Sequence, residues 1–152
     1  MKFKFRLQKL LEYREQIKKE AEQAYQAALS DVNLAEQELH RLFESVHESY
    51  QYIGNSINQR VSSGRSSIGL VNYTEDYIRG QKYQIELQKQ HINELKLIAE
   101  KKREVMVELA TDFHVLEKLK DKSYEEYKVQ LKKLEAKEID DLVTMGFRKK
   151  SG

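Results

Sequence analysis

Residues 62–69, Ser-Ser-Gly-Arg-Ser-Ser-Ile-Gly, form the only cluster of turn-forming residues in the sequence. Serine competes for backbone hydrogen bonds and glycine is costly inside a helix, so this composition predicts a break between helices. The chain has no proline, and nothing in the long flanking runs therefore forbids a continuous helix. The sequence predicts a helical hairpin whose tip is this stretch.

The composition predicts the fold class. The 152 residues are 34% charged and 39% hydrophobic, and none is tryptophan. Because so many charges argue against a deep globular core, the apolar residues must form a stripe. We predict an all-α fold, an antiparallel two-helix coiled-coil hairpin that forms a single coiled-coil domain over residues 1–152, with Gly146 as the final helix stop. The expected segments are helix 1 over about 3–61, the tip over 62–70, helix 2 over about 71–144 and a flexible tail over 145–152.

The second half of the chain carries a sustained heptad repeat. One apolar column consists of Val71, Ile78, Ile85, Ile92, Ala99, Met106 and Phe113. Its companion column contains Thr74, Gln81, Gln88, Leu95, Lys102, Leu109 and Leu116. The matching positions of the first half include Val32, Ala35, Leu39, Leu42, Val46 and Ile53. This repeat is typical of a left-handed coiled coil.

Antiparallel packing requires a register between the two halves. The heptad repeat allows several registers that differ by seven residues, and the turn chemistry selects the one that centres the turn on residue 67. That register pairs Leu39 with Leu95, Leu42 with Ile92, Val46 with Gln88 and Ile53 with Gln81.

Basic side chains recur every seven residues beside the apolar column of the second half. They are Lys82, Lys89, Lys96 and Arg103, and the equivalent column of the first half is Glu36, Phe43, Tyr50 and Ile57. Long basic stems can lie along apolar and aromatic surface, and an exposed cation–π contact adds about 0.5–1 kcal/mol. The pattern predicts packing and solubility and not a ligand site.

Tyrosines gather near the predicted tip. Tyrosine is enriched at protein interfaces because it offers a large rigid surface with a polar end. Two interpretations remain open, since the rings could widen the seam between the helices or form a site for a partner. The tyrosines concerned are Tyr50, Tyr52, Tyr73, Tyr77 and Tyr83.

No group of residues has the spacing of a catalytic site, and a two-helix hairpin has no interior in which to build one. His40, Glu44 and His47 could share a helical flank and bind a metal weakly, but ligands on an open helix lack a closed shell. The glycines and the arginine of the tip could cradle a phosphate, although turn formation already explains them. We therefore expect no enzyme activity, no cofactor and no metal.

Charge and hydropathy also limit the partners. The formal net charge is +2 with acids and bases interspersed, and the basic end at residues 148–150 has no interleaved aromatics, so we expect no nucleic-acid binding. No segment approaches the roughly 20 apolar residues of a membrane span, and the first residues lack the apolar core of a signal peptide. The absence of cysteine suits a reducing compartment. We expect a cytoplasmic protein without direct membrane insertion.

Three passages together resemble the FliJ family, the coiled-coil component of the bacterial flagellar type III export apparatus. The first is the opening pattern Phe3-x-Phe5-Arg6-Leu7-Gln8-Lys9-Leu10-Leu11-x-x-Arg14-Glu15. The second, past the tip, is Asn72-Tyr73-Thr74-Glu75-Asp76-Tyr77-Ile78. The third is the acidic and aliphatic close from Glu138 to Leu142, followed by a short basic tail.

The resemblance implies a non-enzymatic stalk, similar in fold to the stalk subunit of rotary ATPases. The terminal half of the hairpin would insert into the hexameric export ATPase and promote its activity, through Phe5, Leu7, Leu10, Leu11 and Arg14. The tip-proximal half would contact the membrane protein of the export gate through Tyr73, Tyr77 and Ile78. The family also engages export chaperones.

The resemblance further places the protein at the cytoplasmic face of the membrane, held there by the export apparatus. Because the two halves of one chain complete the coiled coil, we expect a monomer. The alternative function is that of a generic coiled-coil tether or a client-holding chaperone.

Overall fold

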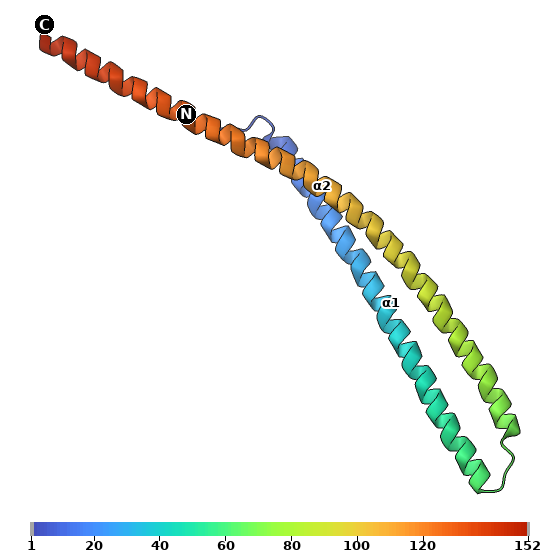
Figure 1. Cartoon of the computed structure of the whole chain (residues 1–152). Helices are drawn as coiled ribbons and strands as arrows, with labels where there is room; N and C mark the ends of the chain where they lie inside the picture. The colour runs from blue at the N-terminus through green and yellow to red at the C-terminus, as the bar shows by residue number, and fades with distance from the viewer. Residues whose placement is uncertain (1, 152) are drawn as a thin grey trace. The chain divides into compact units, whose positions relative to one another are not determined.

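The two halves of the chain form two long helices. The computed structural model describes residues 2–151, with side chains described for residues 2–149. Within that range helix α1 covers Gln8–Ser62, helix α2 covers Ile68–Ser151, and there is no strand. Figure 1 shows the helices joined by one short connection. The prediction of an all-α antiparallel helical hairpin is confirmed.

The helix ends differ from the expected ones. Helix α1 begins at Gln8 and not near residue 3, and the backbone N–H of Gln8 donates to the carbonyl of Phe5 at 3.1 Å as the chain enters the helix. Helix α2 continues past Gly146, the expected stop, to Ser151. Gly146 does not adopt a positive φ. A glycine inside a helix costs only about 1 kcal/mol, too little to end a helix whose neighbouring residues keep their bonds.

The connection between the helices is a glycine-capped turn. Gly64 has a φ of 73° and donates its N–H to the carbonyl of Val61 at 3.1 Å, while the N–H of Arg65 reaches the carbonyl of Arg60 at 2.8 Å. This pair of bonds is the Schellman motif, which satisfies carbonyls at a helix C-terminus and needs a left-handed residue. The carbonyl of Ser67 then accepts the N–H of Val71 at 2.9 Å and starts α2.

We expect Gly64→Ala to destabilise the hairpin by about 1 kcal/mol, because a side chain is strained at positive φ. Gly54→Ala is the matched control. Gly54 lies inside α1 with nothing within 4 Å of an added Cβ, so the same substitution should stabilise by about 0.5–1 kcal/mol. Urea unfolding followed by circular dichroism measures both. Equal effects of the two substitutions would contradict the turn described here.

The helices pack as two compact units. One unit combines Met1–Ala21 with Met106–Gly152, and the other is Glu22–Val105. The first is built around Leu11, Phe113 and Leu116, with Phe5 and Leu7 packed against them. The second contains a cluster of Ala28, Val32 and Ala99, with Leu95 packed against it.

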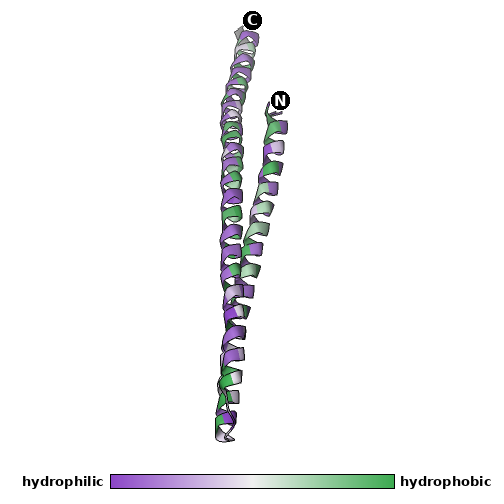
Figure 2. Ribbon diagram, turned by 90° about the vertical axis from the view of Figure 1, so that its right-hand side faces the viewer, coloured by the Kyte–Doolittle hydropathy of each residue, from purple (hydrophilic) through white to green (hydrophobic). Residues whose placement is uncertain are grey.

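The buried residues of α2 follow the predicted heptad column. The column members Ile78, Ile85, Ile92, Ala99 and Phe113 are all at most 8% exposed. Figure 2 shows hydrophobic residues recurring among hydrophilic ones along both helices, as expected for a stripe and not for a globular core.

The predicted register is wrong by about one heptad. Ala99 packs with Ala28 and Val32, although the expected register carries it farther along α1, beyond Val32. Two glutamines of the seam show the physical reason. The expected register sets each of them against an aliphatic side chain, whereas the observed one gives each a hydrogen bond.

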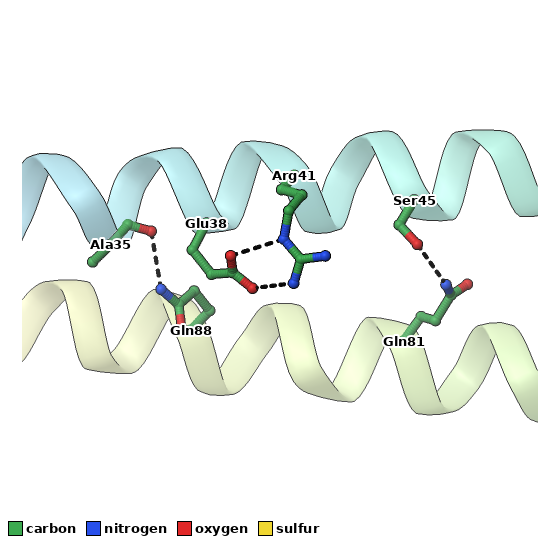
Figure 3. Close-up of polar contacts among 6 residues, drawn as sticks. All are labelled: Ala35, Glu38, Arg41, Ser45, Gln81 and Gln88. Carbon is green, nitrogen blue, oxygen red and sulfur yellow. Dashed lines mark hydrogen bonds and ion pairs between the residues drawn. The ribbon is translucent and has the colours of Figure 1, made fainter.

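Figure 3 shows these two bonds. Gln88 Nε2 donates to the carbonyl of Ala35 at 2.9 Å, and Gln81 Nε2 donates to Ser45 Oγ at 3.2 Å. A buried amide N–H without a partner costs roughly 1–3 kcal/mol, so polar positions in a seam favour a register that gives these donors acceptors. The Oε1 atom of Gln81 is buried without a hydrogen-bond partner. The turn moves accordingly, and its five linking residues are centred on Arg65 and not on residue 67.

Candidate interaction surfaces

Aromatic side chains of α2 hold the segment that precedes α1. The ring of Phe3 lies edge-on to Tyr124, with centroids 5.2 Å apart, and 5.5 Å from the ring of Tyr127. The Lys128 ammonium sits 4.8 Å from the centroid of Tyr124. Sequence reasoning did not identify this cluster. The available signal was that both tyrosines stand at seam positions after a four-residue slip in the heptad phase.

Most of the terminal residues singled out by the resemblance pack internally. Leu11 is 7% exposed and belongs to the core, and Phe5 and Leu7 are half-buried against it. Leu10, by contrast, is 38% exposed. Of these four apolar side chains, Leu10 therefore has the largest exposed fraction.

Arg14 and Lys18 fasten the same stretch of α1 to α2. The Arg14 guanidinium donates to the backbone carbonyl of Asp112 at 3.1 Å. The Lys18 ammonium lies 4.6 Å from the centroid of the Phe113 ring. Arg14 thus has a structural partner within the hairpin while its guanidinium remains partly exposed.

Three tyrosines line one groove beside the tip. Tyr52, Tyr73 and Tyr77 share it with Glu48, and the three rings are between 50% and 73% exposed. The small side chains of the seam leave this space, since Ser45, Ser49 and Thr74 also line the groove. The groove therefore offers aromatic surface to a partner.

Ile78 behaves differently from the neighbouring tyrosines. It is only 6% exposed and belongs to the seam, and its free edge faces a second groove shared with Tyr50 and Lys82. Tyr83 is 63% exposed and lines neither groove. The tyrosine cluster noted in the sequence is thus divided between different faces.

A family model described as "Flagellar FliJ protein" matches residues 3–152. The chain belongs to the FliJ family. No curated protein and no solved structure matches it. Membership of the FliJ family makes the chain a component associated with flagellar protein export, and the family is a non-catalytic one.

Three of the regularly spaced basic side chains of α2 contact the predicted column of α1. The Lys82 ammonium is 5.9 Å from the centroid of Tyr50, and Lys89 is 5.8 Å from that of Phe43. Lys96 pairs with Glu36 at 3.4 Å. These contacts confirm that the basic side chains recurring every seven residues pack along the seam.

Two ion pairs on the surface of the helices shift the pKa values of their own side chains. Arg41 Nε donates to Glu38 Oε2 at 2.8 Å (Figure 3), and this hydrogen bond lowers the pKa of Glu38 below its usual value and raises that of Arg41. Arg103 lowers the pKa of Glu100 in the same way. Both pairs are exposed and three residues apart on one helix, so they stabilise the helix surface modestly.

The histidines considered as metal ligands have other partners. His40 Nε2 lies 2.9 Å from Glu44, and His47 Nε2 lies 3.1 Å from Gln51 Nε2. Across the described residues no three or more histidine, cysteine or acidic side chains are grouped for a metal ion. Neither helix, as far as it is described, contains a stretch long and apolar enough to cross a membrane.

Proposed function

We propose that the chain acts as the stalk of the flagellar export machinery. Its terminal half inserts into the hexameric export ATPase and promotes ATP hydrolysis, while its tip-proximal half contacts the membrane protein of the export gate. It also engages export chaperones and resides at the cytoplasmic face of the membrane through these partners. The observation that carries the proposal is the family match over residues 3–152.

The packing of the terminal unit supports the ATPase contact. Aromatic contacts fix Phe3, and the core fixes Leu11, so the helix start is ordered before any partner binds. An ordered surface loses less conformational entropy on binding than a flexible one. Leu10, Arg14 and the edges of Phe5 and Leu7 are the side chains of this surface that remain accessible.

The tip groove supports the gate contact. Exposed tyrosines in a concave site resemble the aromatic anchors that carry most of the energy of protein interfaces. Tyr73 and Tyr77 line that groove, and Ile78 supports them from the seam. Such a contact leaves the terminal unit free for the ATPase.

The deciding experiment is hydrolysis by the purified export ATPase of the same organism, with and without this protein. We expect a concentration-dependent rise in ATP turnover. A generic tether or client-holding chaperone would leave the turnover unchanged, and that result would reject the stalk proposal.

Replacing both Tyr73 and Tyr77 by alanine should weaken binding to the cytoplasmic part of the gate protein at least about tenfold, because truncated aromatic anchors cost about 2 kcal/mol or more. Tyr83→Ala is the matched control, since Tyr83 is as exposed but lies outside the groove. Calorimetric titration measures the affinities. Equal weakening by both changes would contradict a gate contact in this groove.

A further inference from the structure

The groove beside the tip carries one formal charge, and that charge is negative. We call it the tyrosine groove, after the three side chains that line it, Tyr52, Tyr73 and Tyr77. Glu48 is its only lining side chain that is ionised at neutral pH. The second groove differs, because Arg79 and Lys82 line it. The tyrosine groove therefore presents a carboxylate without a cation of its own to balance it.

The carboxylate of Glu48 is exposed and has no partner within the chain. Among the described side chains, no ion pair and no side-chain hydrogen bond involves Glu48. Glu44, one turn earlier on α1, is by contrast 2.9 Å from His40 Nε2. Glu48 is therefore able to pair with a cation from another molecule.

The chain places its own lysines over other aromatic rings but not over those of this groove. Four lysine ammonium groups lie between 4.6 Å and 5.9 Å from ring centroids, over Phe43, Tyr50, Phe113 and Tyr124. In the part of the chain whose side chains are described, no lysine or arginine lies over Tyr52, Tyr73 or Tyr77 in this way. Because the face of an aromatic ring attracts a cation, three such rings beside a carboxylate favour a cationic ligand.

Two hydroxyl groups that line the groove add acceptors for the same ligand. Ser49 Oγ donates its hydrogen to the carbonyl of Ser45 at 2.9 Å, and Thr74 Oγ1 donates to the carbonyl of Leu70 at 2.6 Å. A hydroxyl that has donated its only hydrogen keeps lone pairs alone for a further partner. Both groups therefore accept from a ligand that brings N–H donors.

The apolar part of the groove suits the side chain of lysine. Ile53 and Leu70 line the groove and are half-buried. A lysine can lay its methylene stem on such surface while its ammonium stays beside polar groups. The acceptors of the groove stand on separate side chains, which the three rotatable donors of an ammonium reach more easily than the planar fork of an arginine.

We propose that the tyrosine groove binds a lysine side chain of a partner protein. The ammonium lies among the three rings and pairs with the carboxylate of Glu48, while the stem lies on Ile53 and Leu70. For the identity of the partner, the inference rests on the proposed function, which assigns this groove to the export gate protein. The chemistry of the contact follows from the groove alone.

A peptide titration tests that chemistry on the isolated full chain. The probe is acetyl-Gly-Gly-Lys-Gly-Gly-amide, and NMR follows the signals of the tyrosine rings. We expect these signals to shift saturably, and the same peptide with an acetylated lysine to bind at least about tenfold more weakly. Signals that do not move, or that move equally with the acetylated peptide, would overturn the proposal. Tighter binding of the corresponding arginine peptide would overturn the choice of lysine.

Glu48→Gln locates the contact, because it removes the charge and keeps the size of the side chain. We expect it to weaken binding of the lysine peptide about threefold or more, as for an exposed ion pair. Glu44→Gln is the matched control, since Glu44 lies on the same helix but does not line the groove. Equal effects of the two substitutions would contradict a contact with Glu48.

Chemical modification of the gate protein separates this inference from the proposed function. Acetylation of its lysines removes their charge, whereas reductive methylation keeps it. We expect acetylation to weaken binding of its cytoplasmic part to this protein at least about tenfold, and methylation to weaken it much less. Absence of binding by the untreated gate protein would reject the gate as the partner. Binding that survives acetylation unchanged would reject the lysine contact alone.

Discussion

Replacing Leu10 by aspartate should remove most of the stimulation of the export ATPase and leave the hairpin folded. Leu10 is 38% exposed, so a carboxylate there stays hydrated in the free protein. In a ring that closes around the helix the same carboxylate would lose water without gaining a partner, at a cost of several kcal/mol. We therefore expect at least about a tenfold loss of stimulation at a fixed protein concentration.

Leu34→Asp is the matched control for this prediction. Leu34 lies on the same helix, is 59% exposed and belongs to the other unit, so the substitution is chemically identical but remote from the terminal surface. Arg14→Ala should give an intermediate loss of stimulation. This substitution also removes the hydrogen bond from Arg14 to the carbonyl of Asp112 inside the hairpin. Stimulation that survives Leu10→Asp unchanged would count against insertion of this end.

The seven-residue repeat of apolar residues correctly predicted the two helices and the buried face of α2. Such a repeat indicates which face of a helix is apolar and therefore buried. Ile85, Ile92 and Ala99 of this face are each at most 5% exposed. The same repeat is nearly unchanged by a shift of seven residues, so it could not choose the register. Hydrogen bonds of Gln81 and Gln88 distinguish the registers, and these depend on where Ser45 and a carbonyl of α1 lie in space.

The candidate surfaces were harder to predict, since adjacent residues have opposite environments. Leu10 and Leu11 are identical in chemistry, yet one is exposed and the other is part of the core. Tyr77 and Ile78 divide in the same way at the tip. A sequence motif contains both neighbours of such a pair. Only the rotation of the helix about its axis, relative to the helix it packs against, decides which neighbour is buried. The aromatic contact of Phe3 was missed because it joins residues at opposite ends of the sequence.

The largest effect on stability is expected from Ile92→Asp. Ile92 is 4% exposed, the lowest value in the hydrophobic core. The substitution forfeits about 1.5–3 kcal/mol of side-chain burial and adds the cost of an unpaired carboxylate in an apolar seam. A total of about 4 kcal/mol or more is a large share of the 5–15 kcal/mol that stabilises a typical domain.

Leu97→Asp separates this effect from a general intolerance of charge. Leu97 lies five residues farther along α2 and is 65% exposed, so the same carboxylate should change the free energy of unfolding by no more than about 0.5 kcal/mol. Thermal and urea unfolding followed by helical circular dichroism measure both. Both substitutions place the same aspartate in the same helix. A large difference between their free energies of unfolding can therefore arise only from burial in the seam. Equal melting of the two variants would mean that α2 packs on a different face.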